Sequence, residues 1–134
     1  AGIPYLPVDI VAAEDCTVMF LNGKTLLNTC DNSCTFHHTL IRNLLGIVAQ
    51  KNMYLNQKIK YTSRKTTREK LMAYLTDQAK LKRSNDFTIP FNRQELADYL
   101  GVERSAMSAE LGKLTKLGIL RTQRSHFTLL KPLD

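Results

Sequence analysis

The apolar residues between about Thr35 and Tyr61 recur at alternating spacings of four and three. This stretch contains no proline and one glycine, Gly46. Alternating spacings of four and three place side chains along one face of a helix, as in the seam of a coiled coil. The sequence therefore predicts one long helix over residues 35–61, with a seam formed by Ile41, Leu45, Val48, Asn52, Leu55 and Ile59.

Asn52 is the single polar residue at this seam. An asparagine at a core position of a coiled coil pairs with its symmetry mate and fixes a parallel, in-register dimer at some cost in stability. We therefore expect a homodimer through this helix. The alternative is a core helix of a monomer. A second apolar row, Leu40, Leu44, Ile47 and Tyr54, is expected to pack on its own subunit.

Three shorter helices are predicted after a break at Thr62-Ser63. The first spans about residues 66–81, with Leu71, Met72 and Leu75 directed inward. The second spans Arg93 to Leu100, with Asn92 as its N-cap and Glu95 three residues later, a variant of the capping box. Gly101 then allows a sharp turn, because glycine adopts the left-handed backbone conformation at little steric cost.

The third short helix begins near Glu103 and has two distinct faces. Met107, Leu111 and Leu114 form its inward stripe. Its opposite face is polar and small, which suits close approach to the DNA major groove, and one long side chain there reaches base edges. The two last helices are typical of a helix-turn-helix, with an outward face made of Arg104, Ser105, Ser108 and Ala109.

Two β-prone runs follow, residues 119–121 and 127–130, separated by polar turn residues. They predict a hairpin, with which a strand over residues 87–91 is expected to pair, giving a winged helix. A hairpin in this place lies against the phosphate backbone of bound DNA. The candidate phosphate contacts are Arg93, Glu103, Arg121, Arg124 and His126; Glu103 alternatively serves the positive N-terminus of its helix.

The first 34 residues have a different sequence pattern from the predicted helices. Residues 8–12 and 16–21 favour β-strands, and Asn22-Gly23 is a turn signal. Two or three strands do not make a stable sheet alone. Since the chain begins Ala-Gly rather than with methionine, we expect it to be the C-terminal part of a longer polypeptide.

The predicted fold class is α+β and mostly α, in three parts. Residues 1–34 are the remnant of a β-domain, residues 35–61 the dimerisation helix, and residues 62–134 the winged helix-turn-helix.

The charge is distributed unevenly along the chain. It carries 19 basic and 12 acidic residues, a net charge of +7. Residues 1–57 have a net charge of −1, so the remainder has +8. Such asymmetry suggests that the second part meets a polyanion, although a basic run is also typical of a solvated helix face. No apolar run long enough to span a membrane and no secretory signal is present, so we expect no membrane partner.

The three cysteines are Cys16, Cys30 and Cys34. An odd number without a signal peptide fits the reducing cytoplasm, where we expect the protein to act. Cys30 and Cys34 precede His37 and His38 at a loose spacing that lacks Cys-x-x-Cys, so we predict no metal site and keep a redox- or metal-responsive regulator as an alternative.

Enzymatic activity is not predicted. The sequence has no Gly-rich phosphate loop, no G-x-S-x-G and no H-E-x-x-H motif. The remaining alternative is a winged helix that binds proteins rather than DNA.

The segment Arg93-Gln-Glu-Leu-Ala-Asp-Tyr-Leu-Gly-Val-Glu-Arg-Ser-Ala-Met-Ser resembles the R-x-E-L-A-x-x-L-G-V-x-R-x-x-V-S pattern of the Crp/Fnr family of bacterial transcription regulators. The order of strands, long helix, hinge and helix-turn-helix is similar to that family too. The resemblance implies a cyclic-nucleotide-binding-like β-roll of which residues 1–34 are the end. It also implies binding of double-stranded DNA as a dimer, contact with RNA polymerase, and base contacts at Arg104, Ser105 and Ala109.

The effector is not identified by this resemblance. Members that bind cyclic AMP hold its phosphate with an Arg-Ser pair, which falls near Leu6-Pro7 here, and its adenine with a Thr-Ser pair, which falls near Met53-Tyr54. Neither pair is retained. We therefore expect a ligand other than cyclic AMP and assign no cofactor.

Overall fold

A computed structural model of the chain describes residues 8–24 and 35–130. It is mixed α/β and mostly helical, as predicted, with one small sheet. The chain divides into two compact units, residues 1–46 and 47–134.

Residues 8–24 contain no strand. The strands expected at residues 8–12 and 16–21 are therefore wrong for the structure. A strand forms by hydrogen bonding to a neighbour, and no other described segment pairs with this one. At the end of the segment the Asn22 side chain accepts a hydrogen bond from the Lys24 backbone N–H (3.0 Å), and Gly23 and Lys24 are helical. The assignment of residues 1–34 to a β-roll stays a prediction.

The long helix is present as α2, Thr35–Thr62. It ends where the sequence predicts, and the Thr62 hydroxyl donates to the carbonyl oxygen of Lys58 (2.9 Å). Most of the predicted seam is exposed: Leu45 is 64% exposed and Val48 63%. An apolar face of this kind on a single helix is not covered by the chain's own described residues.

Helix α3, Thr67–Lys82, begins with a capping box. The Thr66 hydroxyl accepts from the Glu69 N–H, and the Glu69 carboxylate accepts from the Thr66 N–H. The hydrogen bond from the Thr66 backbone is also what lowers the pKa of Glu69 most. Leu71 and Leu75 are fully buried, which confirms the predicted inward face.

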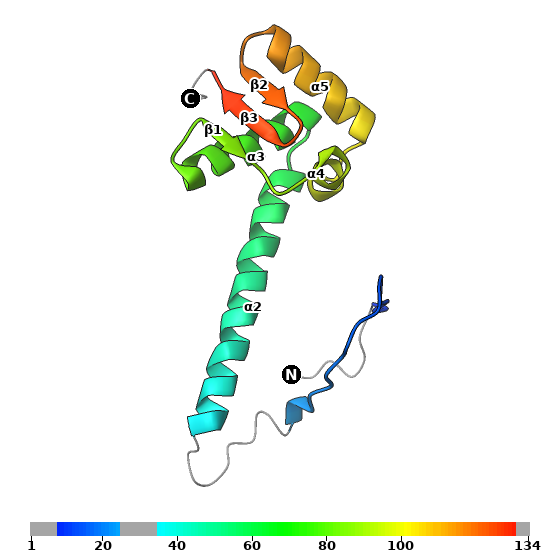
Figure 1. The fold of residues 1–134 in the computed structure, drawn as a ribbon, viewed down its shortest axis with the longest axis vertical. Helices are drawn as coiled ribbons and strands as arrows, with labels where there is room; N and C mark the ends of the chain where they lie inside the picture. The colour runs from blue at the N-terminus through cyan, green and yellow to red at the C-terminus, as the bar shows by residue number, and fades with distance from the viewer. Residues whose placement is uncertain (1–7, 25–34, 131–134) are drawn as a thin grey trace. The chain divides into compact units, whose positions relative to one another are not determined.

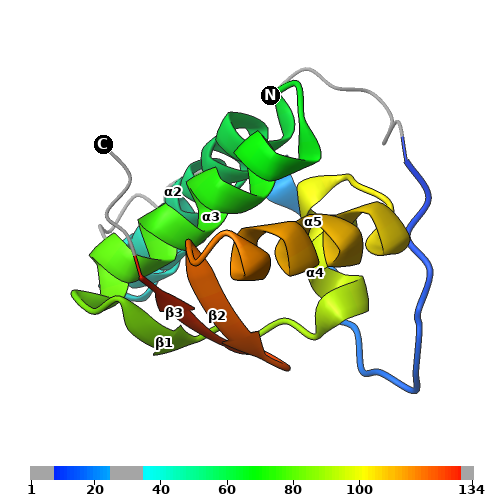
Figure 2. The ribbon, with the colours of Figure 1, turned by 90° about the horizontal axis from the view of Figure 1, so that it is seen from above.

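The sheet has three antiparallel strands in the order β1-β3-β2 (Figures 1 and 2). The strands are β1 (Asp86–Thr88), β2 (Leu120–Gln123) and β3 (His126–Leu129). The hairpin of β2 and β3 and its pairing with β1 confirm the predicted strand arrangement, with bounds shifted by one or a few residues. The central strand β3 buries Phe127, which faces Phe87 of β1.

The core of the second unit lies between the helices and one face of this sheet. Figure 2 shows α3 and α5 lying beside the sheet, with α4 near the start of α5. Helices α4 and α5 span Arg93–Leu100 and Arg104–Lys116. The fully buried large side chains are Leu71, Leu75, Leu96, Leu100, Met107, Leu114, Leu120 and Phe127.

An aromatic cluster joins the last turns of α2 to α3 and α4. Tyr61 of α2 packs edge-on against Tyr74 of α3 (5.5 Å between ring centroids), and Tyr99 of α4 contacts both. Tyr61 is buried and its hydroxyl donates to Asp77 (3.0 Å); burial, followed by the Asp77 contact, raises its pKa. Tyr54, of the predicted second row, also reaches Tyr99 (5.7 Å) although it remains partly exposed.

We expect Leu75→Ala to lower the free energy of unfolding by about 2 to 5 kcal/mol, because it empties a fully buried position. Leu81→Ala, on the same helix at a side chain that is 77% exposed, should change it by less than about 0.5 kcal/mol. Urea denaturation of the two variants measures the difference. Equal losses would contradict this account of the core.

Candidate nucleic-acid interface

The first helix of the helix-turn-helix, α4, is capped as predicted. The Asn92 side chain accepts from the N–H groups of Gln94 (2.9 Å) and Glu95 (3.0 Å), and the Glu95 carboxylate accepts from the Asn92 N–H (2.7 Å). Leu96, Ala97 and Leu100 are buried. The capping box therefore fixes where α4 begins, and its apolar face fixes its orientation on the core.

The turn after α4 depends on Gly101, whose φ is 60°. Its N–H returns to the carbonyl oxygens of Ala97 and Asp98, which closes the helix. From α3, the Lys70 ammonium donates to the Gly101 carbonyl oxygen (3.2 Å). The turn is thus fixed both by its own backbone and by a contact from the preceding helix.

Helix α5 has the two faces that the sequence predicts. Met107, Leu111 and Leu114 are at most 3% exposed. Glu103 is its N-cap residue but makes no side-chain cap hydrogen bond. The solvent-facing side chains of its first two turns are all short except one arginine, and the predicted base contacts Arg104, Ser105, Ser108 and Ala109 are all exposed.

An ion-pair network attaches α5 to α3. Arg68 of α3 donates through its Nε to the Glu110 carboxylate, and Lys113 Nζ lies 3.5 Å from the same group. The hydrogen bond from Arg68 is the main cause of the lowered pKa of Glu110. Because Glu110 is only 14% exposed, this contact is better shielded from solvent than a typical surface pair.

The hairpin turns at Arg124 and Ser125. Arg124 has a φ of 53°, a left-handed conformation that is uncommon for a residue other than glycine. The Ser125 hydroxyl donates to the Phe91 carbonyl oxygen (3.0 Å), which ties the turn to the segment that enters α4. Arg121, on β2, is exposed.

Arg93 is in a different position from the other expected phosphate contacts. It is the first residue of α4 and is half-buried. Its Nη2 donates to Thr122 Oγ1 (2.6 Å), and its Cζ lies 5.0 Å from the centre of the Phe127 ring. His126 has a partner as well, since its Nε2 lies against the Asp86 carboxylate.

A cleft of about 410 Å³ opens where α4, α5 and the hairpin turn converge. Among the described residues, no carboxylate lines this cleft. The side chains of Arg104 and Arg124 make no hydrogen bond or ion pair with any residue in 8–24 or 35–130. Arg104 and Arg124 can therefore offer their charge to an anion in this cleft. The residues that line the cleft are Asn92, Arg93, Gln94, Arg104, Arg124 and Ser125.

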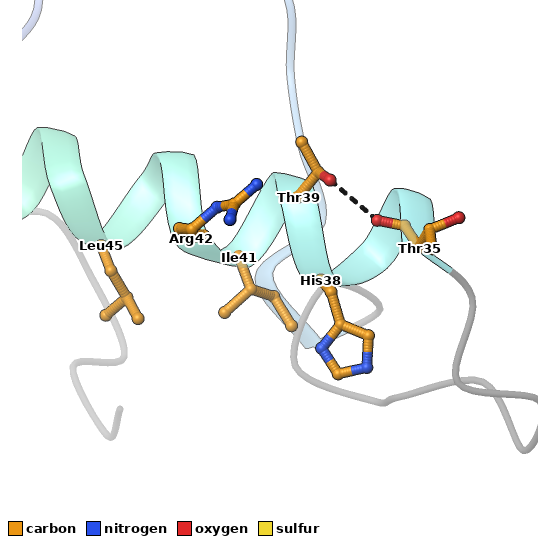
Figure 3. Close-up of a pocket in the computed structure, with 6 residues that line it drawn as sticks. All are labelled: Thr35, His38, Thr39, Ile41, Arg42 and Leu45. Atoms are coloured by element: carbon orange, nitrogen blue, oxygen red, sulfur yellow. Dashed lines mark hydrogen bonds between the residues drawn. The ribbon is translucent and has the colours of Figure 1, made fainter.

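A second hollow, of about 550 Å³, lies along the first turns of α2 (Figure 3). In Figure 3, Ile41 and Leu45 of the predicted seam point to the same side as His38. Thr39 donates to the Thr35 carbonyl oxygen (2.9 Å), within the helix. Among the described residues only α2 lines this hollow, so it is part of an open helix face and not an enclosed ligand site.

The seam itself is accessible along α2. Ile41 is half-buried, whereas Asn52, Leu55 and Ile59 are exposed. The Asn52 side-chain oxygen accepts a hydrogen bond from Asn56 Nδ2. Dimerisation through this seam stays a prediction.

Of the three cysteines, Cys16 is exposed, and Cys30 and Cys34 lie outside the described residues. Within residues 8–24 and 35–130 no group of three or more metal-ligating side chains comes together. The same ranges hold no helix long and apolar enough to cross a membrane.

The family model of the Crp-like helix-turn-helix domain matches residues 69–133. This confirms the resemblance to the C-terminal part of a Crp/Fnr-type regulator, and it indicates a DNA-binding regulator. The matched range contains α4, α5 and the hairpin. No curated protein matches the chain in sequence.

Several contacts that position the interface have no signal in the sequence. Arg68 and Glu110 are 42 residues apart, and Arg93 and Thr122 are 29 apart. Such pairs share no helical or strand spacing, so only the packing of α3, α4, α5 and the hairpin reveals them.

We expect Gly101→Ala to destabilise the protein by roughly 1 to 2 kcal/mol, because alanine is strained at a φ of 60°. The nearest atom to a new Cβ, Thr62 Cγ2 at 3.8 Å, makes no clash, so strain is the whole effect. Gly112→Ala, in the interior of α5 with open space around it, should stabilise by about 0.5 to 1 kcal/mol. Thermal or urea unfolding distinguishes the two signs, and two changes of the same sign would contradict the argument.

Proposed function

We propose that this chain is part of a transcription regulator that binds a palindromic DNA site as a dimer, with α5 of each subunit in the major groove. The observation that carries the proposal is the exposed face of α5, which combines short side chains with the unpaired Arg104. A helix of this kind approaches base edges closely and reads them with one long donor. The matched Crp-like helix-turn-helix domain supports it.

The residues of α5 suit different base contacts. The Arg104 guanidinium matches the O6 and N7 acceptors of guanine. Ser105 and Ser108 donate or accept through a hydroxyl, and Ala109 fits against a thymine methyl. One strong bidentate contact with several weak ones implies a half-site defined mainly by one G·C pair.

The hairpin then acts as a wing that contacts the phosphate backbone. Arg124 at its tip and Arg121 on β2 are exposed cations on the hairpin. His126 is a weaker candidate, because it lies against Asp86. Glu103 carries a negative charge and fits the positive N-terminus of α5 better than a phosphate.

We expect the purified chain to enrich a palindrome from randomised duplexes, and Arg104→Ala to relax selection at one position of each half-site. The affinity should fall as salt rises, with a slope of about −0.9 in log K against log salt for each phosphate contacted. Lys82→Ala, which removes a charge from the last turn of α3, is the matched control and should leave the selected sequence unchanged.

No enrichment by the folded wild-type chain, or enrichment that Arg104→Ala leaves intact, would oppose the proposal. Binding to DNA without salt dependence would favour a protein-interaction module.

The proposed dimer forms through the exposed face of α2. Leu45, Val48, Leu55 and Ile59 are between 55% and 64% exposed. Their burial against a second copy removes apolar surface from water, at roughly 25 cal/mol per Å². Asn52 then exchanges its contact with Asn56 for its symmetry mate and holds the two helices in register.

Leu55→Glu should abolish the dimer, since it places a charge at the seam. Gln57→Glu introduces the same charge on the same helix, two residues away and off the seam, and should leave the dimer intact. Sedimentation equilibrium gives both association constants. A wild-type monomer at tens of micromolar, or two variants with equal effects, would refute the seam.

Control by an effector is the remaining part of the proposal. A ligand bound by a β-roll would shift α2 between two geometries and so change the spacing of the two recognition helices. The effector is unidentified, and cyclic AMP is disfavoured by Met53 and Tyr54 at the adenine-contacting positions. RNA polymerase is the further partner that this class of regulator implies.

A further inference from the structure

One arginine at the start of α4 contacts both strands of the hairpin. Arg93 Nη2 donates to Thr122 on β2, and the Arg93 guanidinium lies over the Phe127 ring on β3. Thr122 and Phe127 are directly opposite each other in the sheet register. Arg93 therefore holds the hairpin at a single rung, two residues before Arg124 at its tip.

The surroundings of Arg93 do not suit a phosphate contact. Its Nη2 is taken by Thr122, and its Nη1 is buried with no hydrogen-bond partner among the described residues. Burial lowers the pKa of this guanidinium from its usual value. A cation removed from water above an aromatic face gains cation–π attraction, and that attraction increases with desolvation. Both terminal nitrogens are thus directed at the protein.

A second set of contacts fastens the hairpin tip to the same place. The Ile89 N–H donates to the Ser125 carbonyl oxygen (3.0 Å), and the Ser125 hydroxyl donates to Phe91 (3.0 Å). Ile89 and Phe91 belong to the segment that leads into α4. Arg124 is the residue immediately before Ser125, so its backbone is held from both sides.

We propose that Arg93 is a positioning residue for DNA binding: it fastens the hairpin to α4 and so holds Arg124 at a fixed place across the cleft from Arg104. This rests on the proposed function and replaces the phosphate contact expected at Arg93. A charged group that is already in place loses less conformational entropy when it binds. Arg124 and α5 therefore engage one stretch of DNA together.

The first measurement does not involve DNA. Thr122→Val removes the acceptor of the Arg93 hydrogen bond while keeping shape and charge. Thr128→Val on β3 is the control, because the contact that it removes, from the Thr128 hydroxyl to Asp86 (3.4 Å), does not involve Arg93. Amide hydrogen exchange at Ile89 reports whether the hairpin tip stays attached. We expect exchange about tenfold faster in Thr122→Val, with no such change in Thr128→Val. The Leu96 amide, inside α4, verifies that global stability is retained.

The second measurement is a double-mutant cycle in DNA affinity, with the full chain and one duplex. Thr122→Val should weaken binding by about threefold to tenfold in the wild-type background and by less than twofold in Arg124→Ala. Arg124→Ala alone should make the slope of log K against log salt shallower by about 0.9, the value for one phosphate contact. Arg93→Lys keeps the charge but not the planar fork, and should behave like Thr122→Val.

Unchanged exchange at Ile89 in Thr122→Val and Arg93→Lys would overturn the fastening role, whatever happens with DNA. Wild-type affinity in Arg93→Lys, or equal effects of Thr122→Val in the presence and absence of Arg124, would overturn its role in binding. If the wild-type chain binds no DNA, the proposed function fails. Faster exchange at Ile89 in Thr122→Val would still support the fastening role of Arg93, so the two failures are distinguishable.

Discussion

The burial of one stripe of α5 is the constraint on which the interface depends. Met107, Leu111 and Leu114 each lose nearly all contact with water, and burial of a side chain of this size is worth roughly 1.5 to 3 kcal/mol. Rotation of α5 about its axis would expose this stripe and bury Arg104 and two serines, which the core cannot solvate. The same packing that stabilises the domain therefore turns the polar face outward.

The contacts around this stripe decide how α5 and the hairpin are presented together. Arg68 holds Glu110 of α5, and Lys70 holds the Gly101 carbonyl at the turn. Arg93 attaches the hairpin to α4, and Ser125 attaches it to the segment before α4. These polar contacts lie at the edge of the core, where partial burial strengthens them and geometry selects their partners. An interface for a rigid polyanion needs such fixed spacing between its cations.

Helix α2 is buried near its end and exposed along its predicted seam. Near its end Tyr61 is buried among Tyr74 and Tyr99, so this part is packed into the helix-turn-helix unit. Along the seam, Leu45 and Val48 remain exposed. The end of α2 is thus connected to α3 and α4 through these aromatic rings.

The sequence by itself determined the elements whose signals are local. The four-and-three spacing predicted α2 and α5, the Asn92–Glu95 capping box predicted the start of α4, and Gly101 predicted the turn, because each depends on residues a few positions apart. It misjudged residues 8–12 and 16–21, since a strand needs a partner that local propensity does not supply. Only the tertiary structure decided that Arg93 binds Thr122 and lies over Phe127, that Arg68 binds Glu110, and that Arg104 and Arg124 share a cleft. The reason is that these groups are brought together by packing of distant segments, which no periodicity encodes.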